Sequence, residues 1–395
     1  MRAIRLALMV ATLVSCTRAD REPGATPAVR TDSTGVTIVR STGTDRELPW
    51  RFTRHLVLGG DESGPASFYR VRGVDTDARG NLYVLDAGSH RVVVFDSTGA
   101  VVREMGRKGG GPGEMQWPLQ LTVMTDGGVA VYYLGRRGLV VFDSAGVPRD
   151  AGVRTPVEMS STDVVRHAGD GWYLSRLDQS NDESVIRATL VHHAGAGEVE
   201  LVRMEKPRPR MISFPNCPIQ VSMGPIFEPE PAWDARGGRV VTARGAEYAV
   251  DVYVNDRLSA SYRRDVASRV ATSELAKKQV SDGMTANWPG GRCVIGAADV
   301  VQARGVAPVI QAISEVRLTP DGELFVARNR VQGEPTLIDV LTPEGDYLGT
   351  LPAGSWPMPK AFLPNGDLVI VETDMETDVQ RVVTLRVERD TAGAP

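Results

Sequence analysis

The sequence is short of cysteine and lysine and carries no block of basic residues. Among its 395 residues there are three cysteines and 45 basic side chains, of which only five are lysines. The basic residues are scattered among 49 acidic ones, and the formal net charge is −4. The basic stripe typical of nucleic-acid-binding proteins is therefore absent, and nucleic acid is not an expected partner. With 42% hydrophobic residues, the chain has ordinary globular composition and enough apolar material for a core.

Several enzyme and metal motifs are also missing. The sequence contains no H-E-x-x-H, C-x-x-C, G-x-S-x-G or calcium-loop pattern. His192 and His193 form the one histidine pair, but neighbouring residues of a regular strand point to opposite faces and cannot chelate one ion. His90-Arg91 is interpreted as a structural turn. We predict no catalytic residue.

The N-terminus has the pattern of an export signal. Arg2 and Arg5 precede an apolar stretch over residues 6–14, which is too short for the ~20 residues of a membrane span. The following Ser15-Cys16 completes "LVSC", which resembles the bacterial lipobox and implies that Cys16 is diacylated and becomes the mature N-terminus. The alternatives are an ordinary signal peptide with a chance cysteine, or an anchor helix.

This signal also predicts where the protein resides. Residues 1–16 would be the lipoprotein signal, and the polar residues 17–31 a flexible tether to the membrane. No aspartate follows Cys16, which on the pattern of Gram-negative lipoproteins favours the outer membrane over the inner. We therefore expect a lipid-anchored protein of the cell envelope. The membrane is then one partner, through the N-terminal lipid.

A pattern of apolar run, turn and apolar run recurs six times along the chain. Asp-Gly and Asn-Gly turns between β-branched runs are strong hairpin signals. The glycines of the first turn recur mostly every 44 to 47 positions, which is typical of β-propeller blades; they are Gly80, Gly127, Gly171, Gly237, Gly322 and Gly366. We predict an all-β, six-bladed propeller over residues 32–389, followed by a tail over residues 390–395. The predicted blades cover residues 68–106, 119–150, 163–205, 232–265, 313–351 and 358–389.

Two of the repeat intervals are long because loops are inserted in them. The first insert is proline-rich and contains Cys217; the second contains Cys293 and one stretch that favours a short helix. Thr272 or Ser273 would cap this helix, and Gly283 would end it. If Cys16 is lipidated, Cys217 and Cys293 remain, and we hypothesise that they form a disulfide in an oxidising compartment. Such a bond would join the two inserts and stabilise the fold by roughly 4 kcal/mol in the chain-entropy model.

The ring is predicted to close through an N-terminal strand. "GGDESGP" after residue 58 matches "GRKGGGP" after residue 105, which follows the outermost strand of the first repeat. Residues 51–58 should therefore be the outermost strand of the last blade, beside residues 362–387, leaving no exposed sheet edge. Residues 32–40 are expected to form an additional strand near this closure.

The first repeat, "VDTDARGNLYVLDAGSHRVVVFDSTGAVVREMGRKGGGPGE", resembles an NHL repeat. As a whole, roughly over residues 36–389, the chain is similar to bacterial six-bladed propeller lipoproteins. This resemblance implies a fold and an envelope location, but no activity. Within it, the glycine-rich residues 109–113 are interpreted as a crossing between blades and not as a phosphate cradle, because no P-loop spacing or following helix is present.

Two functions remain open at this stage. The first is a binding scaffold whose loop face holds an envelope protein, a peptide or a glycan, with no cofactor. The alternative is a metal-assisted hydrolase or lyase of the lactonase or amidating-lyase type, with Ca or Zn on the central channel. For that alternative the candidate ligands are Asp86, Glu372 and Asp374, which stand at predicted strand ends.

Overall fold

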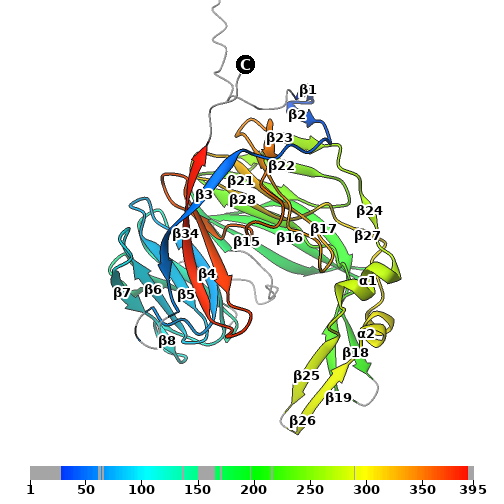
Figure 1. The fold of residues 1–395 in the computed structure, drawn as a ribbon, viewed down its shortest axis with the longest axis horizontal. Helices are drawn as coiled ribbons and strands as arrows, with labels where there is room; N and C mark the ends of the chain where they lie inside the picture. The colour runs from blue at the N-terminus through cyan, green and yellow to red at the C-terminus, as the bar shows by residue number, and fades with distance from the viewer. Residues whose placement is uncertain are drawn as a thin grey trace, which may run out of the picture.

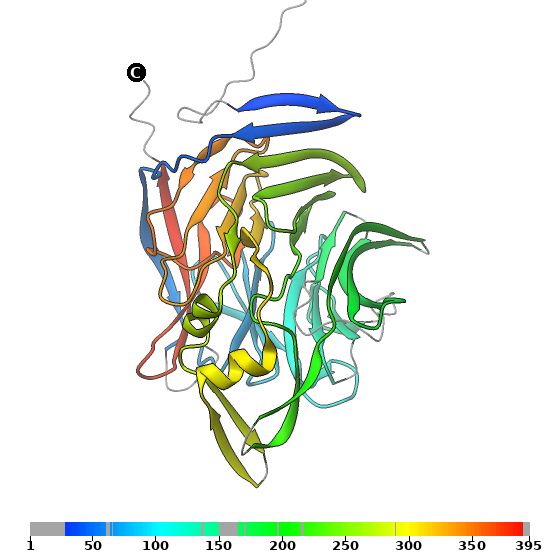
Figure 2. The ribbon, with the colours of Figure 1, turned by 90° about the vertical axis from the view of Figure 1, so that its right-hand side faces the viewer.

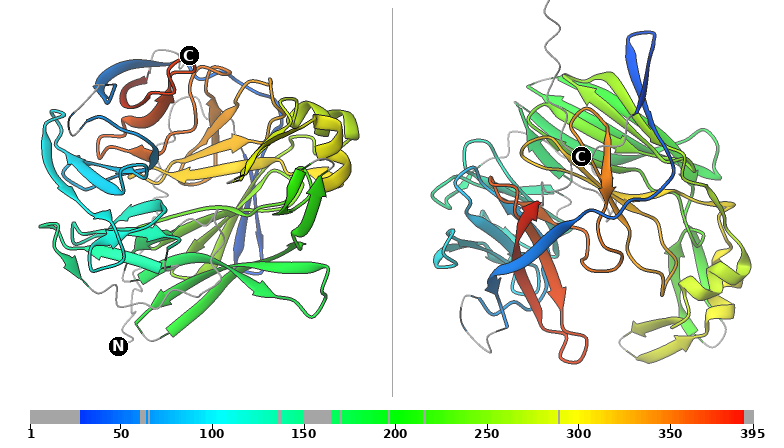
Figure 3. Two further views of the ribbon diagram at one scale, coloured as in Figure 1. Left: turned by 90° about the horizontal axis from the view of Figure 1, so that it is seen from below. Right: turned by 45° about the horizontal axis from the view of Figure 1, so that its top comes forward.

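Six β-sheets stand around a central axis in the computed structural model, five with four strands and one with six. The structure describes residues 28–60, 64, 66–135, 138–149, 165–169, 171–195, 197–214, 217–288 and 290–389. Seen from below, the sheets follow one another around the ring (Figure 3). The predicted six-bladed β-propeller is therefore confirmed.

Each blade is an antiparallel sheet. The blades are numbered in chain order, and the strands of each blade are given from the innermost to the outermost. Blade one contains β4 (Val71–Thr76), β5 (Leu82–Asp86), β6 (Arg91–Phe95) and β7 (Val101–Met105), and blade two β10 (Pro118–Val123), β11 (Val129–Tyr133), β12 (Gly138–Phe142) and β13 (Pro148–Arg149). Blade three contains β14 (Val165–Ala168), β15 (Gly171–Gln179), β16 (Val185–Ala194) and β17 (Gly197–Pro207), and blade four β20 (Ala232–Arg236), β21 (Arg239–Ala243), β22 (Ala249–Val254) and β23 (Arg257–Arg264). Blade five contains β28 (Ile313–Leu318), β29 (Leu324–Arg328), β30 (Ile338–Leu341) and β31 (Tyr347–Thr350), and blade six β32 (Ala361–Phe362), β33 (Leu368–Thr373), β34 (Gln380–Arg389) and β3 (Trp50–Leu58).

Most of the repeated glycines mark turns that glycine adopts more easily than other residues, whereas Gly171 is the first residue of β15. Gly80, Gly127, Gly322 and Gly366 have φ values of 83°, 80°, 87° and 85°, in the left-handed region. Each lies in the tight turn between the innermost strand and the second strand of its blade. The second strands, which follow these turns, are the more deeply buried; β5 and β11 are buried at every position. Neighbouring sheets therefore pack face to face, and the core lies between the blades.

The N-terminal strand closes the ring as predicted. β3 pairs antiparallel with β34, with Trp50 opposite Arg389 and Leu58 opposite Val382. Figure 1 shows the two strands, one from each end of the chain, side by side. Blade six thus joins both ends of the chain.

The segment before this strand was predicted to lie near the closure, and this prediction was wrong. β1 (Val29–Ser33) and β2 (Val36–Ser41) form a hairpin, and β2 pairs parallel with β23 on the outer edge of blade four. Residues 29–31 therefore belong to a strand and not to the tether. Val39 is buried in the core shared by blades four and five, which explains the choice of partner. The sequence identifies an outer strand here but not the sheet that it joins.

Between β2 and β3, the chain crosses the outer edge of blade five. The Leu48 amide donates to the Thr350 carbonyl, and the Thr350 amide donates to the Arg46 carbonyl, over distances of 2.8 and 2.7 Å. Residues 29–58 thus run along the outer edges of blades four, five and six in succession; we call them the N-terminal strap. In Figure 2 the strap crosses the top of the ring before it descends as β3.

A buried group of charges fixes the strap in place. The carboxylate of Asp339 is fully buried and accepts hydrogen bonds from Arg264 at 2.8 Å and from Arg328 at 2.8 and 2.9 Å. Both arginines also contact Asp45 of the strap. The hydrogen bond from Arg328 holds the pKa of Asp45 below its usual value despite partial burial.

The two inserts lie on one face of the ring. They contain β18 (Arg210–Phe214), β19 (Cys217–Met223), β24 (Arg269–Val270), α1 (Ser273–Gln279), β25 (Met284–Trp288), β26 (Gly291–Ile295), α2 (Ala297–Arg304) and β27 (Val309–Ile310). The predicted helix is α1, and the Thr272 side chain caps it by accepting from the Leu275 amide. The described residues contain a second helix, α2, that was not predicted. Gly296 and Gly305 occupy the N-cap and C-cap positions of this helix.

Replacing Asp339 by alanine tests the buried charge group. The substitution leaves Arg264 and Arg328 buried without their shared carboxylate, so we expect unfolding free energy to fall by about 3–5 kcal/mol. Urea denaturation followed by circular dichroism measures this change. Asp321→Ala, in an exposed turn of the same blade, is the control and should change stability by less than about 0.5 kcal/mol. Equal stability of the two variants would contradict the assignment.

Candidate functional site

The two inserts fold together into one unit, which we call the inserted module (the described residues of 208–230 and 265–312). It has its own hydrophobic core, separate from the cores between blades. Fully buried members come from both inserts: Ile212, Phe214, Cys217 and Ile226 from the first, and Ala276, Ala286, Ile295, Val300 and Val301 from the second. Cys217 and Cys293 form the predicted disulfide, with their Cα atoms 5.7 Å apart. Figures 1 and 2 show the module projecting from one face of the ring.

A bidentate ion pair attaches the inserted module to blade five. The Arg269 guanidinium donates to both oxygens of Glu334 over 2.8 and 2.9 Å. The Glu334 carboxylate also accepts from the Val331 amide. The hydrogen bonds from Arg269 and Val331 lower the pKa of Glu334 from 4.5 to about 2. A short link of this kind orients the module relative to the ring.

The outward faces of the two module hairpins combine charged and apolar side chains. Arg210 and Met211 are exposed on β18, and Arg292 and Val294 on β26. Met211 is 62% exposed and Val294 68%, although each lies on a strand whose neighbouring residues point into the module core. Arginine and methionine are among the residues enriched in protein–protein interfaces. These faces are therefore a candidate docking surface.

The three candidate metal ligands serve other purposes in the structure. Asp86 is fully buried and accepts hydrogen bonds from the Tyr69 and Arg70 amides at 3.2 and 3.0 Å. Glu372 forms an ion pair with Arg54 at 2.7 Å. Asp374 accepts from the amides of residues 376 and 377, within its own turn, and these bonds lower its pKa.

These acids do not form the centre that the enzymatic alternative requires. In the described part of the chain, no group of three or more His, Cys, Asp or Glu side chains could hold a metal ion. The three candidates come from blades one and six. Glu372 and Asp374 are engaged by the contacts above, and the second oxygen of Asp86 lies 3.5 Å from the Arg91 guanidinium. The donor set present therefore gives no support to a metal-assisted reaction at these residues.

The glycine-rich loop after blade one has a carboxylate of its own. β8 (Arg107–Lys108) pairs parallel with β9 (Glu114–Met115) between blades one and two. The Gly111 amide donates to Glu114 at 2.8 Å, and Arg107 contacts the same carboxylate at 2.9 Å. The position that a phosphate would occupy in a cradle is thus filled by Glu114, and the interpretation as an inter-blade crossing holds.

The histidine pair divides between two faces of β16. His192 contacts Asp256 at 2.7 Å and stacks on Tyr173, whereas His193 contacts Glu198 at 3.1 Å. His90 and Arg91 lie in the β5–β6 turn, where Arg91 bonds the Ser67 carbonyl and Glu104. The side chains of His192, His193 and Arg91 thus have structural contacts.

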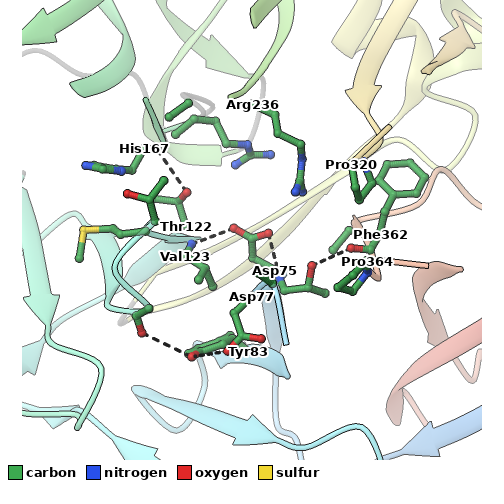
Figure 4. A pocket seen from close by; sticks show the side chains of 18 of the residues that line it. Asp75, Asp77, Tyr83, Thr122, Val123, His167, Arg236, Pro320, Phe362 and Pro364 are labelled. Atoms are coloured by element: carbon green, nitrogen blue, oxygen red, sulfur yellow. Dashed lines mark hydrogen bonds between the residues drawn. The ribbon is translucent and has the colours of Figure 1, made fainter. Parts of the chain in front are cut away.

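A second candidate site, which the sequence did not indicate, lies on the axis at the opposite face. A chamber of about 570 Å³ is lined by the ends of all six innermost strands and by the turns that follow them. Figure 4 shows Asp75, His167, Arg236 and Phe362 around this chamber. The inserts precede the starts of β20 and β28, while the chamber surrounds their ends, so the two candidate sites lie on opposite faces of the ring. We call this cavity the axial chamber.

The fold and these sites define a six-bladed β-propeller with an inserted module. The family model of the NHL repeat matches residues 68–95, which confirms the predicted resemblance for the first blade. Curated protein sequences yield no match.

Solved structures resemble the chain only distantly in sequence. A protein of Bacteroides fragilis NCTC 9343, described by its name as exported, is 12% identical with a TM-score of 0.53; the match covers 89% of this chain and 99% of that one. A DUF4221 family member from Bacteroides vulgatus ATCC 8482 is 11% identical with a TM-score of 0.48, covering 87% and 100%. A streptogramin B lyase is 9% identical with a TM-score of 0.39, covering 86% and 97%. The first of these likenesses supports the fold alone.

Neither described helix has the length and apolar character needed to cross a bilayer. The predicted lipidation site, Cys16, and the C-terminal tail lie outside the described residues.

The link between Arg269 and Glu334 predicts a pH-dependent effect of Glu334→Gln. The folded-state pKa of about 2 lies below the ordinary 4.5, so ionised Glu334 stabilises the docked module at pH values above 4.5. This contribution is lost as the pH falls towards about 2. We expect faster amide hydrogen exchange in α1 of the variant at neutral pH, and a difference from the unmodified protein that shrinks between these two values.

Glu376→Gln, at an exposed position in blade six, serves as the control and should leave exchange in α1 unchanged. A difference between Glu334→Gln and the unmodified protein that stays constant down to the lowest pH would refute the role assigned to this ion pair.

Proposed function

We propose that this chain is a lipid-anchored binding protein of the cell envelope whose inserted module captures a partner protein. The observation that carries this proposal is the module itself: two inserts far apart in sequence share one core and one disulfide on one face of the ring. The propeller supplies a rigid platform, and the module supplies a surface that the repeats alone do not have.

The chemistry of the module favours a protein partner over a glycan or a free small molecule. Its outward faces present Arg210, Met211, Arg292 and Val294, and none of these four side chains lines the axial chamber or the two smaller described cavities. Flat surfaces with arginine and exposed apolar side chains are typical of protein interfaces. The disulfide reduces the freedom of the module before binding, which lowers the entropy lost on capture.

The membrane anchor is proposed on the N-terminal signal. Two or more acyl chains on Cys16 would give stable anchoring, because each buried methylene contributes ~0.8 kcal/mol. The strap begins at Val29, and the polar residues of the sequence between it and Cys16 would serve as the tether.

Substitutions on the module should abolish partner capture. Met211→Asp combined with Val294→Asp places charge on both hairpin faces, and we expect the envelope protein that co-purifies with the unmodified chain after cross-linking to be lost. Both side chains are exposed, so the module should stay folded. Val147→Asp, also exposed but between β12 and β13 on the opposite face, should retain the partner. Retention of the same partner by the double variant would refute the proposal.

Cys16→Ser tests the anchor. We expect the unmodified protein to partition into the detergent phase of Triton X-114 and to carry an acylated N-terminal cysteine by mass spectrometry. The variant should lack the acyl group and leave the detergent phase. An unmodified protein whose mature N-terminus bears no lipid would show that the lipobox interpretation is wrong.

A further inference from the structure

The acidic side chains of the axial chamber are already occupied by the protein. Asp75 accepts from the Thr76 amide at 2.9 Å and from the Val123 amide of the next blade at 2.8 Å. Asp234 accepts from Arg166 at 2.7 Å and from the Leu318 amide at 2.9 Å. These carboxylates join neighbouring blades, and both oxygens of each have a donor.

The arginines around Asp234 keep this carboxylate ionised. Burial raises the pKa of Asp234, but the charges of Arg166 and Arg317 outweigh it and hold the pKa below its usual value. Asp234 therefore stays negative and neutralises part of the positive charge in its surroundings. It is not a free acid available to a cation.

The basic side chains of the chamber exceed the acidic ones. Six basic residues line it, Arg79, Arg103, Arg166, Arg236, Arg317 and Lys360, against the four acids Asp75, Asp77, Asp126 and Asp234. The surplus is two positive charges if all ten are ionised. Asp77 and Asp126 are also engaged, by Asn81 and Tyr83 and by Arg149 respectively.

Two arginines have donors left for a ligand. Arg236, at the end of β20, lines the chamber and has no side-chain hydrogen bond or ion pair with any described residue. Figure 4 shows its side chain directed into the chamber. Arg317 contacts Glu315 at 2.5 Å, but its Nε atom is buried without a partner. Lys360 lies 3.7 Å from the same glutamate and is exposed at the rim.

Apolar side chains line another part of the wall. Pro320, Phe362 and Pro364 lie together on one side of the chamber (Figure 4). The volume of about 570 Å³ falls within the range of small-molecule sites, which combine apolar walls with a few directed polar groups. A guanidinium binds carboxylates and phosphates through two parallel hydrogen bonds, so an unpaired arginine in such a cavity selects oxyanions.

We propose that the axial chamber binds a small organic oxyanion, whose carboxylate or phosphate group pairs with Arg236 and Arg317 and whose apolar part rests on Phe362 and its neighbouring prolines. This site is independent of the inserted module, which lies on the other face. Its ligand is recognised by charge and shape, and no metal is needed to hold it.

The proposal is tested by isothermal titration calorimetry on the full chain with three probes: succinate, isophthalate and phenyl phosphate. At least one probe should bind with one-to-one stoichiometry, and the probes that bind identify the oxyanion as carboxylate or phosphate. The neutral isophthalamide should not bind. Binding should weaken as salt is added, because the interaction is between charges.

Arg236→Gln removes the unpaired guanidinium and leaves a shorter, neutral side chain that can still form hydrogen bonds. We expect the dissociation constant of the binding probe to rise roughly tenfold to a hundredfold, the loss typical of one charge-assisted hydrogen bond. The control, Arg257→Gln, changes an exposed arginine at the start of β23 and should leave affinity unchanged. Circular dichroism confirms that both variants are folded. The proposal is overturned if no probe binds at millimolar concentration, or if Arg236→Gln binds as tightly as the unmodified protein.

Discussion

The carboxylate of Asp339, buried between Arg264 and Arg328, fixes the path of the N-terminal strap. Its two partners belong to blades four and five, and both also contact Asp45 of the strap. Buried ion pairs add little to stability when compared with well-packed apolar residues, but removing one partner of such a pair destabilises the fold strongly. We infer that this group determines where the strap crosses the ring more than it increases the overall stability.

The closure of the ring depends on the point at which the strap crosses it. Once Asp45 is held, Arg46 and Leu48 pair with the edge of blade five, and β3 reaches β34 in register. The strap thus contacts the outer edges of three consecutive blades: blades four and six each pair with one of its strands, and blade five contacts it through an isolated bridge at Glu47. These pairings join residues more than 200 positions apart, and contacts of such long sequence separation carry a large loop-closure entropy, which is typical of slowly folding proteins.

The sequence predicts those features that depend on local chemistry. The turn glycines with positive φ locate the blades, the likeness of two glycine-rich loops locates β3, and Thr272 locates α1, because each signal lies within a few residues of the element it predicts. The parallel partner of β2 could not be predicted, since the outer edges of several blades accept the same apolar pattern. The axial chamber escaped prediction for a related reason: Arg236 and Phe362 meet only when six strands of different repeats end around one axis.

Only two of the described innermost strands, β20 and β28, run from the inserted module to the axial chamber. β20 begins where the first insert ends and carries Asp234 and Arg236 to the chamber, and β28 begins where the second insert ends and carries Arg317 there. No other described innermost strand starts at the module. Movement of the module on partner binding could reach the chamber directly only through these two strands, which the Asp234 bond to the Leu318 amide holds together. The turns at the chamber ends of β20 and β28 are tight, and the strands next to them are buried, so we expect these two strands to resist sliding. We therefore infer that the ring determines the shape of the chamber, and that a partner bound at the module does not change it.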